Sequence, residues 1–239
     1  MMPSLLNARV TPRRALPAAL EPVVLTRAQR VSTHMLASLL LDYPDAEWFA
    51  RLDRLPAHIV ALPGTVRDPL ERFIAAARAA GPDAFARAYV ETFDLKRKCS
   101  LYLSYYATGD TRKRGTALVT FLEAYRAAGW EFEAADLPDY LPAVLEFSAR
   151  SESEVAEALL SAHVEGIEVL RAALEDMDSP WADVVRTVTL SLPAISPATR
   201  ERVLDLVTEG PPVETVGLSF LGNLAPFSPT TAATMKDQS

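Results

Sequence analysis

Residues 110–129 read DTRKRGTALVTFLEAYRAAG and give the clearest indication of the fold. Their apolar side chains recur three and four residues apart, which places them on one face of a helix: Ala117, Leu118, Phe121, Leu122, Tyr125 and Ala128. Asp110 stands where a helix N-cap is expected, and Gly129 stands where a helix ends. The stretch therefore predicts an amphipathic helix that packs one face against a core.

Helical periodicity continues on both sides of this stretch. Residues 26–41 carry Val31, Met35 and Leu39 at intervals of four, with Leu36 and Leu40 beside them. Residues 99–107 have strand propensity, but their helical neighbours favour a helix. The other helices that we expect are Asp45–Leu62 with a kink or break at Pro56, one that begins at Asp68, Pro82–Phe93, one entered through Pro138 and Pro142, a long one opened by Ser151-Glu152-Ser153-Glu154 that runs to Leu174, and two opened by Ser179-Pro180 and Ser196-Pro197.

The composition also favours helices. Apolar residues make up 49% and charged residues 23% of the 239-residue chain, the mixture of an ordinary globular protein. Glycines number only nine, and the eighteen prolines lie mostly between periodic segments, where they separate helices. We therefore predict an all-α protein, a single bundle of roughly ten helices over residues 26–210. A flexible tail is expected at residues 1–25 and an irregular one at residues 211–239.

The charge balance restricts the partners. A formal net charge of −7 disfavours binding to nucleic acid. Two basic clusters, KRK at residues 96–98 and RKR at residues 112–114, are interpreted as solvated helix ends or loop residues. No window approaches the ~18 uninterrupted apolar residues of a membrane span, and the single cysteine, Cys99, cannot form an internal disulfide. We expect a cytoplasmic protein without stable membrane insertion.

Residues that would carry catalysis or hold a metal are sparse. His34, His58 and His163 lie on different predicted helices and have no ligand-spaced partner. The sequence has no glycine-rich phosphate loop and no nucleophile-elbow motif. We therefore predict no catalytic residue, no metal site and no bound cofactor, and a protein that is not an enzyme.

A proline-rich turn separates two strongly periodic helices. Residues 136–142 read DLPDYLP and place two prolines around an acidic and an aromatic residue, Asp139 and Tyr140. Because proline restricts the backbone, both side chains are expected to be held in a set direction at a helix start. Two interpretations stay open at this point: a helix cap made by Asp139, or a docking surface.

These stretches resemble the NarJ-type nitrate reductase assembly chaperones, within the wider TorD-like family of molybdoenzyme chaperones. The motifs that carry the resemblance are Leu40–Asp45, Tyr89–Asp94, Leu101–Phe147 with Gly109–Gly115 inside it, Leu122–Gly129 and Leu137–Pro142. They cover about half of the chain in aligned order. The family's Pro-Asp-His appears here as Pro138-Asp139-Tyr140, so that a phenol replaces an imidazole.

The resemblance implies an all-helical fold of the TorD-like chaperone type. Such proteins bind the N-terminal region of the apo catalytic (molybdenum) subunit of nitrate reductase, support insertion of the molybdenum cofactor and assembly of the complex, and are not part of the finished enzyme. We hypothesise a groove with an aromatic wall and a set of carboxylates for a basic, partly apolar client peptide. Its candidate residues are Tyr89, Glu91, Phe93, Tyr102, Leu118, Tyr125, Asp136, Pro138, Asp139, Tyr140 and Glu146.

Alternatives from other classes stay open. One alternative is a helical ligand-sensing or transcription-control protein, whose DNA-binding form would show a helix-turn-helix with a basic recognition helix, which the sequence lacks. A helical enzyme with a cryptic pocket would retain its ligand on purification. Phe93 and Leu118 fit a core as well as a groove. The client could be a sister molybdoenzyme, and a homodimer formed by exchange of helices is compatible with a bundle.

Overall fold

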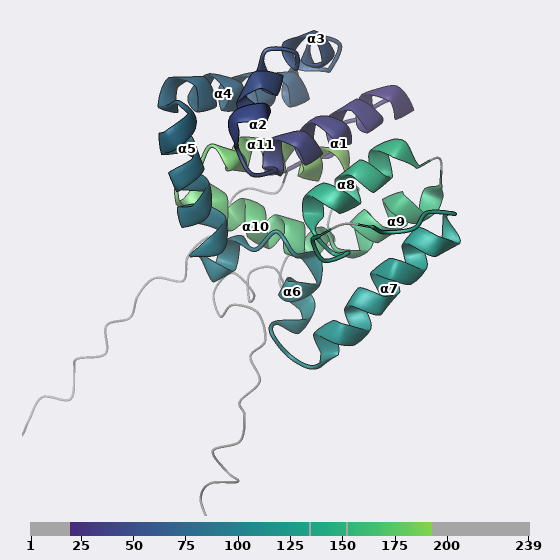
Figure 1. Ribbon diagram of the computed structural model, residues 1–239. Coiled ribbons are helices and arrows are strands. Elements are labelled where there is room, and N and C mark those ends of the chain that lie inside the picture. Colours follow the sequence, from purple (N-terminus) through teal and green to yellow (C-terminus); the bar gives the residue numbers. More distant parts are fainter. Residues whose placement is uncertain (1–19, 134, 152, 193–239) are drawn as a thin grey trace, which may run out of the picture.

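The computed structural model describes residues 20–133, 135–151 and 153–192 (Figure 1). Residues 1–19, most of the predicted N-terminal tail, lie outside the described residues. So do the helix predicted to open at Ser196-Pro197 and the predicted irregular segment 211–239.

The described residues form eleven α-helices and no strand beyond an isolated bridge, which confirms the all-α class. The elements in chain order are α1 (Arg27–Leu41), α2 (Ala46–Leu52), α3 (Pro56–Ile59), α4 (Gly64–Ala80), α5 (Pro82–Tyr89), the π-helix η1 (Val90–Asp94), the 3₁₀ turn η2 (Arg97–Cys99), α6 (Leu103–Thr108), α7 (Lys113–Ala127), α8 (Leu141–Arg150), α9 (Glu154–Ala162), α10 (Val164–Asp176) and α11 (Trp181–Ser191). The break expected near Pro56 is present, since α2 ends at Leu52 and α3 starts at Pro56 itself.

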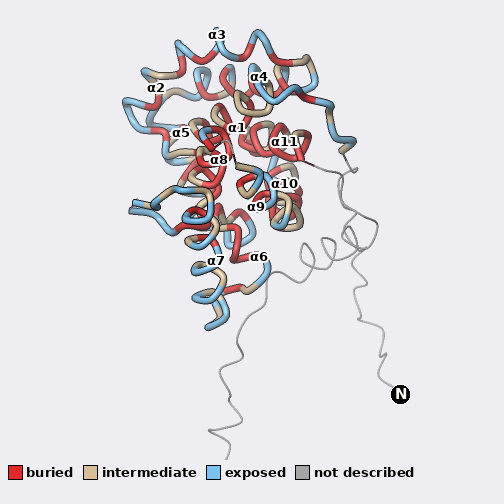
Figure 2. Tube along the Cα trace, turned by 90° about the vertical axis from the view of Figure 1, so that its right-hand side faces the viewer, coloured by how far each residue is buried: buried red, intermediate tan, exposed pale blue. Residues whose placement is uncertain are grey.

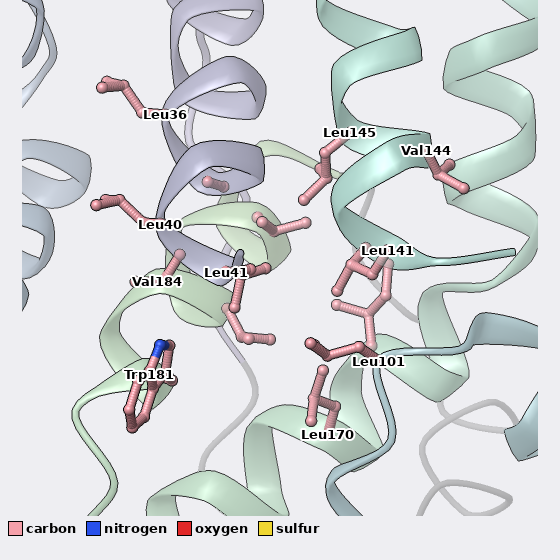
Figure 3. Packing of buried hydrophobic residues seen from close by; sticks show 14 of the residues in the cluster. Leu36, Leu40, Leu41, Leu101, Leu141, Val144, Leu145, Leu170, Trp181 and Val184 are labelled. Atoms are coloured by element: carbon pink, nitrogen blue, oxygen red, sulfur yellow. The ribbon is translucent and has the colours of Figure 1, made fainter. Parts of the chain in front are cut away.

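Helix α1 lies at the centre and packs against α8 and α11, while α11 also packs against α4 and α10. Leucines and valines from these helices interdigitate in the core (Figure 3), and Leu40, Leu41 and Leu145 are fully buried. The buried stripe of α1 runs through Leu36, Ala37, Leu40 and Leu41. Val31, Met35 and Leu39, which the periodicity places on that stripe, are only half-buried.

Aromatic side chains join α2, α4, α5 and α11. The rings of Phe85 and Trp181 stack with centroids 4.4 Å apart. Trp48 and Phe73 lie 5.6 Å and 5.7 Å from Phe85, and Phe73 also contacts Trp181 at 6.0 Å. Figure 2 shows buried residues concentrated in the middle of the bundle, with α2, α3 and α4 at one end and α6 and α7 at the other.

Four predicted boundaries are wrong. Helix α4 begins at Gly64 rather than Asp68, because buried Val66 adds a turn to its apolar face before Asp68, and Pro69 lies inside the helix. The long helix predicted to start at Ser151 is two helices divided at His163, and Ser153 is the N-cap of the first.

The other two errors lie near α6 and α7. Residues 99–107 are not one helix, because Tyr102 has an extended backbone and forms an antiparallel bridge with Tyr140. Asp110 does not cap α7, whose N-cap residue is Arg112 without a side-chain cap bond. Asp110 instead binds Arg97, at 2.7 Å.

Candidate functional site

The proline-rich turn is pinned to the segment before α6 by backbone hydrogen bonds. The Leu141 amide donates to the Leu101 carbonyl at 2.7 Å, and the Leu103 amide donates to the Asp139 carbonyl at 2.9 Å. These bonds place the start of α8 beside the start of α6. Two segments far apart in the sequence thus form one rigid edge.

Beside this edge lies a pocket of about 270 Å³. It is lined by side chains from three regions: residues after α1, residues at the α5–η1 junction, and both segments of the pinned edge. The lining residues are Asp42, Tyr43, Tyr89, Phe93, Asp94, Ser100, Leu101, Tyr102, Asp136 and Tyr140. We call it the tyrosine pocket.

Two tyrosine hydroxyls meet in this pocket. The Tyr89 hydroxyl donates to the Leu41 carbonyl at 3.0 Å, which leaves Tyr140 to donate to Tyr89 across 3.3 Å. Burial raises the pKa of both phenols, and Asp42 raises them further. Both hydroxyls therefore stay protonated at physiological pH and serve as hydrogen-bonding groups rather than as bases.

The aromatic rings around these hydroxyls form a continuous wall. Tyr89 contacts Tyr43 edge to face at 5.5 Å and Phe93 at 4.7 Å, and Tyr102 lies 5.5 Å from Tyr140. Tyr43 is 47% exposed, so one ring of the wall faces solvent. The wall offers π faces to an incoming apolar or cationic group.

Three carboxylates surround the rings: Asp42, Asp94 and Asp136. Within the part of the chain that the structure describes, none of these three carboxylates forms an ion pair. Other carboxylates of the bundle do pair with arginines. Burial raises the pKa of Tyr102, and Asp136 raises it further, as expected where negative charge gathers. The pocket therefore favours a cationic ligand.

Five of the candidate groove residues line the tyrosine pocket: Tyr89, Phe93, Tyr102, Asp136 and Tyr140. The other six lie elsewhere. Glu91 is exposed on η1, and Leu118 is half-buried on α7. Glu146 pairs with Arg150 at 2.7 Å.

The remaining three candidates are buried and structural. Asp139 has no exposed surface and accepts hydrogen bonds from the Ser104 amide (3.1 Å) and hydroxyl (2.5 Å). Tyr125 donates to the carbonyl of buried Pro138 at 3.2 Å. Asp139 thus caps α6, which belongs to a distant segment of the chain. The sequence had suggested a cap on the helix that follows the turn itself.

Asp42, Tyr43, Asp94, Ser100 and Leu101 line the pocket but were not among the candidates. Asp42, Tyr43 and Asp94 lie within the stretches that carry the family resemblance, which was the available signal. Their proximity depends on α1 ending beside α5 and could not be read from spacing along the chain.

Residues 61–186, more than half of the chain, match the family model described as nitrate reductase delta subunit. The chain belongs to the nitrate reductase delta subunit family. The matched range contains the tyrosine pocket except for Asp42 and Tyr43.

Two proteins named as assembly chaperones are similar to a large part of the chain. The chain is 33% identical over 164 residues to the "Probable nitrate reductase molybdenum cofactor assembly chaperone NarJ" of Bacillus subtilis (strain 168), covering 68% of this chain and 89% of that protein. It is 33% identical over 156 residues to the nitrate reductase molybdenum cofactor assembly chaperone NarJ of Escherichia coli (strain K12), covering 60% and 66%.

A larger protein also matches. The nitrate reductase-like protein NarX of Mycobacterium tuberculosis is 38% identical over 152 residues, which is 64% of this chain. The match spans only 23% of the length of NarX, so NarX contains much more than this chain.

The described part of the delta-family bundle shows neither a metal site nor a membrane span. No three histidine, cysteine or acidic side chains within residues 20–133, 135–151 and 153–192 lie close enough together to hold a metal ion. None of the helices described there is long and apolar enough to cross a bilayer.

Proposed function

We propose that this chain is an assembly chaperone for a nitrate reductase. It binds the N-terminal region of the apo catalytic subunit, supports insertion of the molybdenum cofactor and assembly of the complex, and is absent from the finished enzyme. It acts in the cytoplasm, catalyses no reaction and holds no cofactor of its own, and residues 26–210 form its working domain. Membership of the delta subunit family and the names of its NarJ relatives support this role.

The observation that carries the proposal is the tyrosine pocket, whose three carboxylates form no ion pair with any residue that the structure describes. An aromatic wall beside Asp42, Asp94 and Asp136 suits a peptide that carries both apolar and basic side chains. The apolar side chains would gain from burial against the rings, and a cation over a tyrosine face contributes about 0.5–2 kcal/mol. The carboxylates would orient the peptide and speed its encounter.

The rigidity of the pocket favours binding over catalysis. Tyr89 and Tyr140 are held by hydrogen bonds, and their raised pKa keeps them neutral. A preformed wall loses little conformational entropy when a ligand binds. The peptide therefore meets a surface that is already shaped.

Calorimetry tests the proposal directly. A synthetic peptide with the N-terminal sequence of the catalytic subunit is titrated into the full chain and into the double variant Asp94→Asn/Asp136→Asn. We expect a loss of affinity of about tenfold or more, because both lost charges face the ligand. The matched control is Glu47→Gln/Asp83→Asn, which removes two exposed carboxylates from α2 and α5. Equal affinities for all three proteins would move the binding site away from this pocket.

A further inference from the structure

The fold brings the two basic clusters of the sequence together beside the tyrosine pocket. Asp110 accepts a hydrogen bond from the Arg97 guanidinium at 2.7 Å and lies 3.4 Å from the Arg114 guanidinium. Arg97 also donates to the hydroxyl of buried Tyr105, at 3.1 Å. These contacts join residues 96–98 to residues 112–114 in one surface, which we call the basic patch.

Within the basic patch, arginines hold the structure and lysines face the solvent. Arg114 lies over the Tyr102 ring at 5.4 Å and is mostly buried. Lys96 and Lys113 are exposed, and neither has an ion pair with any residue that the structure describes. Three of the four lysines of the chain lie in this patch. Lysine is a mobile, hydrated point charge, which suits salt-sensitive contacts with carboxylates.

The arrangement is locally unfavourable for α7. Its first turn contains Lys113 and Arg114 and no acidic residue, and its N-cap makes no side-chain bond. Basic residues at a helix N-terminus oppose the helix dipole, at a cost of about 0.3–1 kcal/mol each when exposed. Residues that lower the stability of their own helix are expected mainly at functional sites, so the basic start of α7 indicates a functional role.

The basic patch borders the tyrosine pocket. Tyr102 lines the pocket and carries Arg114 against its ring. Asp94, another lining residue, lies two positions before Lys96. A surface of one sign therefore adjoins a surface of the other. A long polyanion such as nucleic acid would meet Asp94 and Asp136 as well as the lysines, whereas a short acidic peptide segment need only contact the patch.

We propose that the basic patch docks an acidic segment of the same client polypeptide whose basic, apolar segment enters the tyrosine pocket. The identity of the client rests on the proposed function. The two surfaces together would fix the direction in which the client lies on the chaperone, because reversing it would place like charges opposite each other.

The charge preference of the patch is tested with a fluorescein-labelled peptide of six glutamates, by fluorescence anisotropy on the full chain at low ionic strength. Lys96→Glu/Lys113→Glu should weaken binding by about tenfold, and added salt should weaken wild-type binding. The control Arg27→Glu/Arg54→Glu makes the same change in net charge at exposed sites outside the patch, and Arg54 lies between α2 and α3 at the other end of the bundle (Figure 2). Equal losses in the two double variants would show a response to net charge alone and would overturn the proposal.

The second measurement separates this inference from the proposed function. The purified apo catalytic subunit and its N-terminal peptide are each titrated with wild type and Lys96→Glu/Lys113→Glu. We expect the whole subunit to bind about tenfold more weakly to the variant, while the basic peptide binds equally or more tightly, because added negative charge lies beside the pocket.

Unchanged affinity for the whole subunit would overturn the basic patch as a docking surface, and so would preferential binding to vesicles of anionic phospholipid. If the N-terminal peptide bound no form of the protein while the whole subunit still distinguished the variant, the patch proposal would hold. The pocket assignment under the proposed function would then fail.

Discussion

The Asp139 carboxylate accepts two hydrogen bonds from Ser104, one from its amide at 3.1 Å and one from its hydroxyl at 2.5 Å. Ser104 stands in the first turn of α6, where backbone amides have no helical partner. The residues of the motif Pro138-Asp139-Tyr140 thus have different roles. Asp139 stabilises the edge of the pocket from inside the protein, and its neighbour Tyr140 forms part of the wall.

Removing this cap should lower the stability of the fold without removing a group that contacts the ligand. Asp139→Ala leaves the Ser104 amide and hydroxyl unpartnered in a buried place, and we expect the free energy of unfolding to fall by about 2 kcal/mol. Urea denaturation followed by circular dichroism measures the change. Asp136→Ala, an exposed residue of the same turn, serves as the control and should shift stability by less than about 0.5 kcal/mol. The assignment of Asp139 as a cap would be wrong if the two variants were equally stable.

Replacing Tyr140 with histidine should make client binding depend on pH. In wild type the pKa of Tyr140 is raised by burial and by Asp42, so position 140 carries no charge from pH 5 to 8. An imidazole with an ordinary pKa of about 6.5 would gain a positive charge as the pH falls. The affinity of Tyr140→His for the basic peptide should therefore decrease below about pH 6.5, because like charges then meet in the pocket. Calorimetry across this range should show a steeper profile for the variant than for Tyr140→Phe, and parallel profiles would contradict the placement of residue 140.

His34 should make the fold less stable in mild acid. Burial lowers its pKa to about 4, and its two ring nitrogens lie 2.9 Å from the Ser148 hydroxyl and 2.8 Å from the Ser191 hydroxyl. Because the unfolded chain binds a proton at about pH 6.5, stability is lost as the pH falls from about 6.5 to 4, by up to about 3 kcal/mol. Urea midpoints of His34→Gln should show a smaller pH slope than wild type over this window.

His163 supplies the comparison for that experiment. Burial also lowers its pKa, but the hydrogen bond between its Nδ1 and the Leu159 carbonyl (2.8 Å) and the negative charge of Asp139 oppose that shift. His163→Gln should keep most of the wild-type pH slope. If the pH slope changed in His163→Gln and not in His34→Gln, the acid sensitivity would come from His163 and the prediction for His34 would be wrong.

Two glycines give a matched pair of substitutions. A Cβ at Gly166 on α10 would lie 2.8 Å from a ring carbon of Tyr106 on α6, whereas one at Gly115 on α7 would meet nothing within 4 Å. Gly166→Ala should lower the free energy of unfolding by about 1–3 kcal/mol through overpacking. Gly115→Ala should raise it by about 0.5–1 kcal/mol, because alanine favours the helix. Denaturation midpoints that move in the same direction would contradict the close approach of α6 and α10.

The sequence was informative wherever the cause of a structure is local. The helix that starts near Thr26, the break before Pro56 and the turn at Gly129 depend on a few neighbouring residues, and each was predictable from them. Boundaries failed where burial outweighed local preference. Because Val66 is buried, α4 starts earlier in the chain than expected. The pairing of Tyr102 with Tyr140 interrupts a stretch whose sequence favours a helix.

For the site, the sequence identified the motif, and tertiary contacts divided its residues between pocket and core. Asp139 and Tyr140 are adjacent, yet the carboxylate is completely buried beneath α6 while the phenol faces the pocket. Asp42 and Tyr43 join the site only because α1 ends beside α5. Helix signals lie within a turn or two of chain, whereas a pocket is the shared surface of segments that meet only when the apolar core closes.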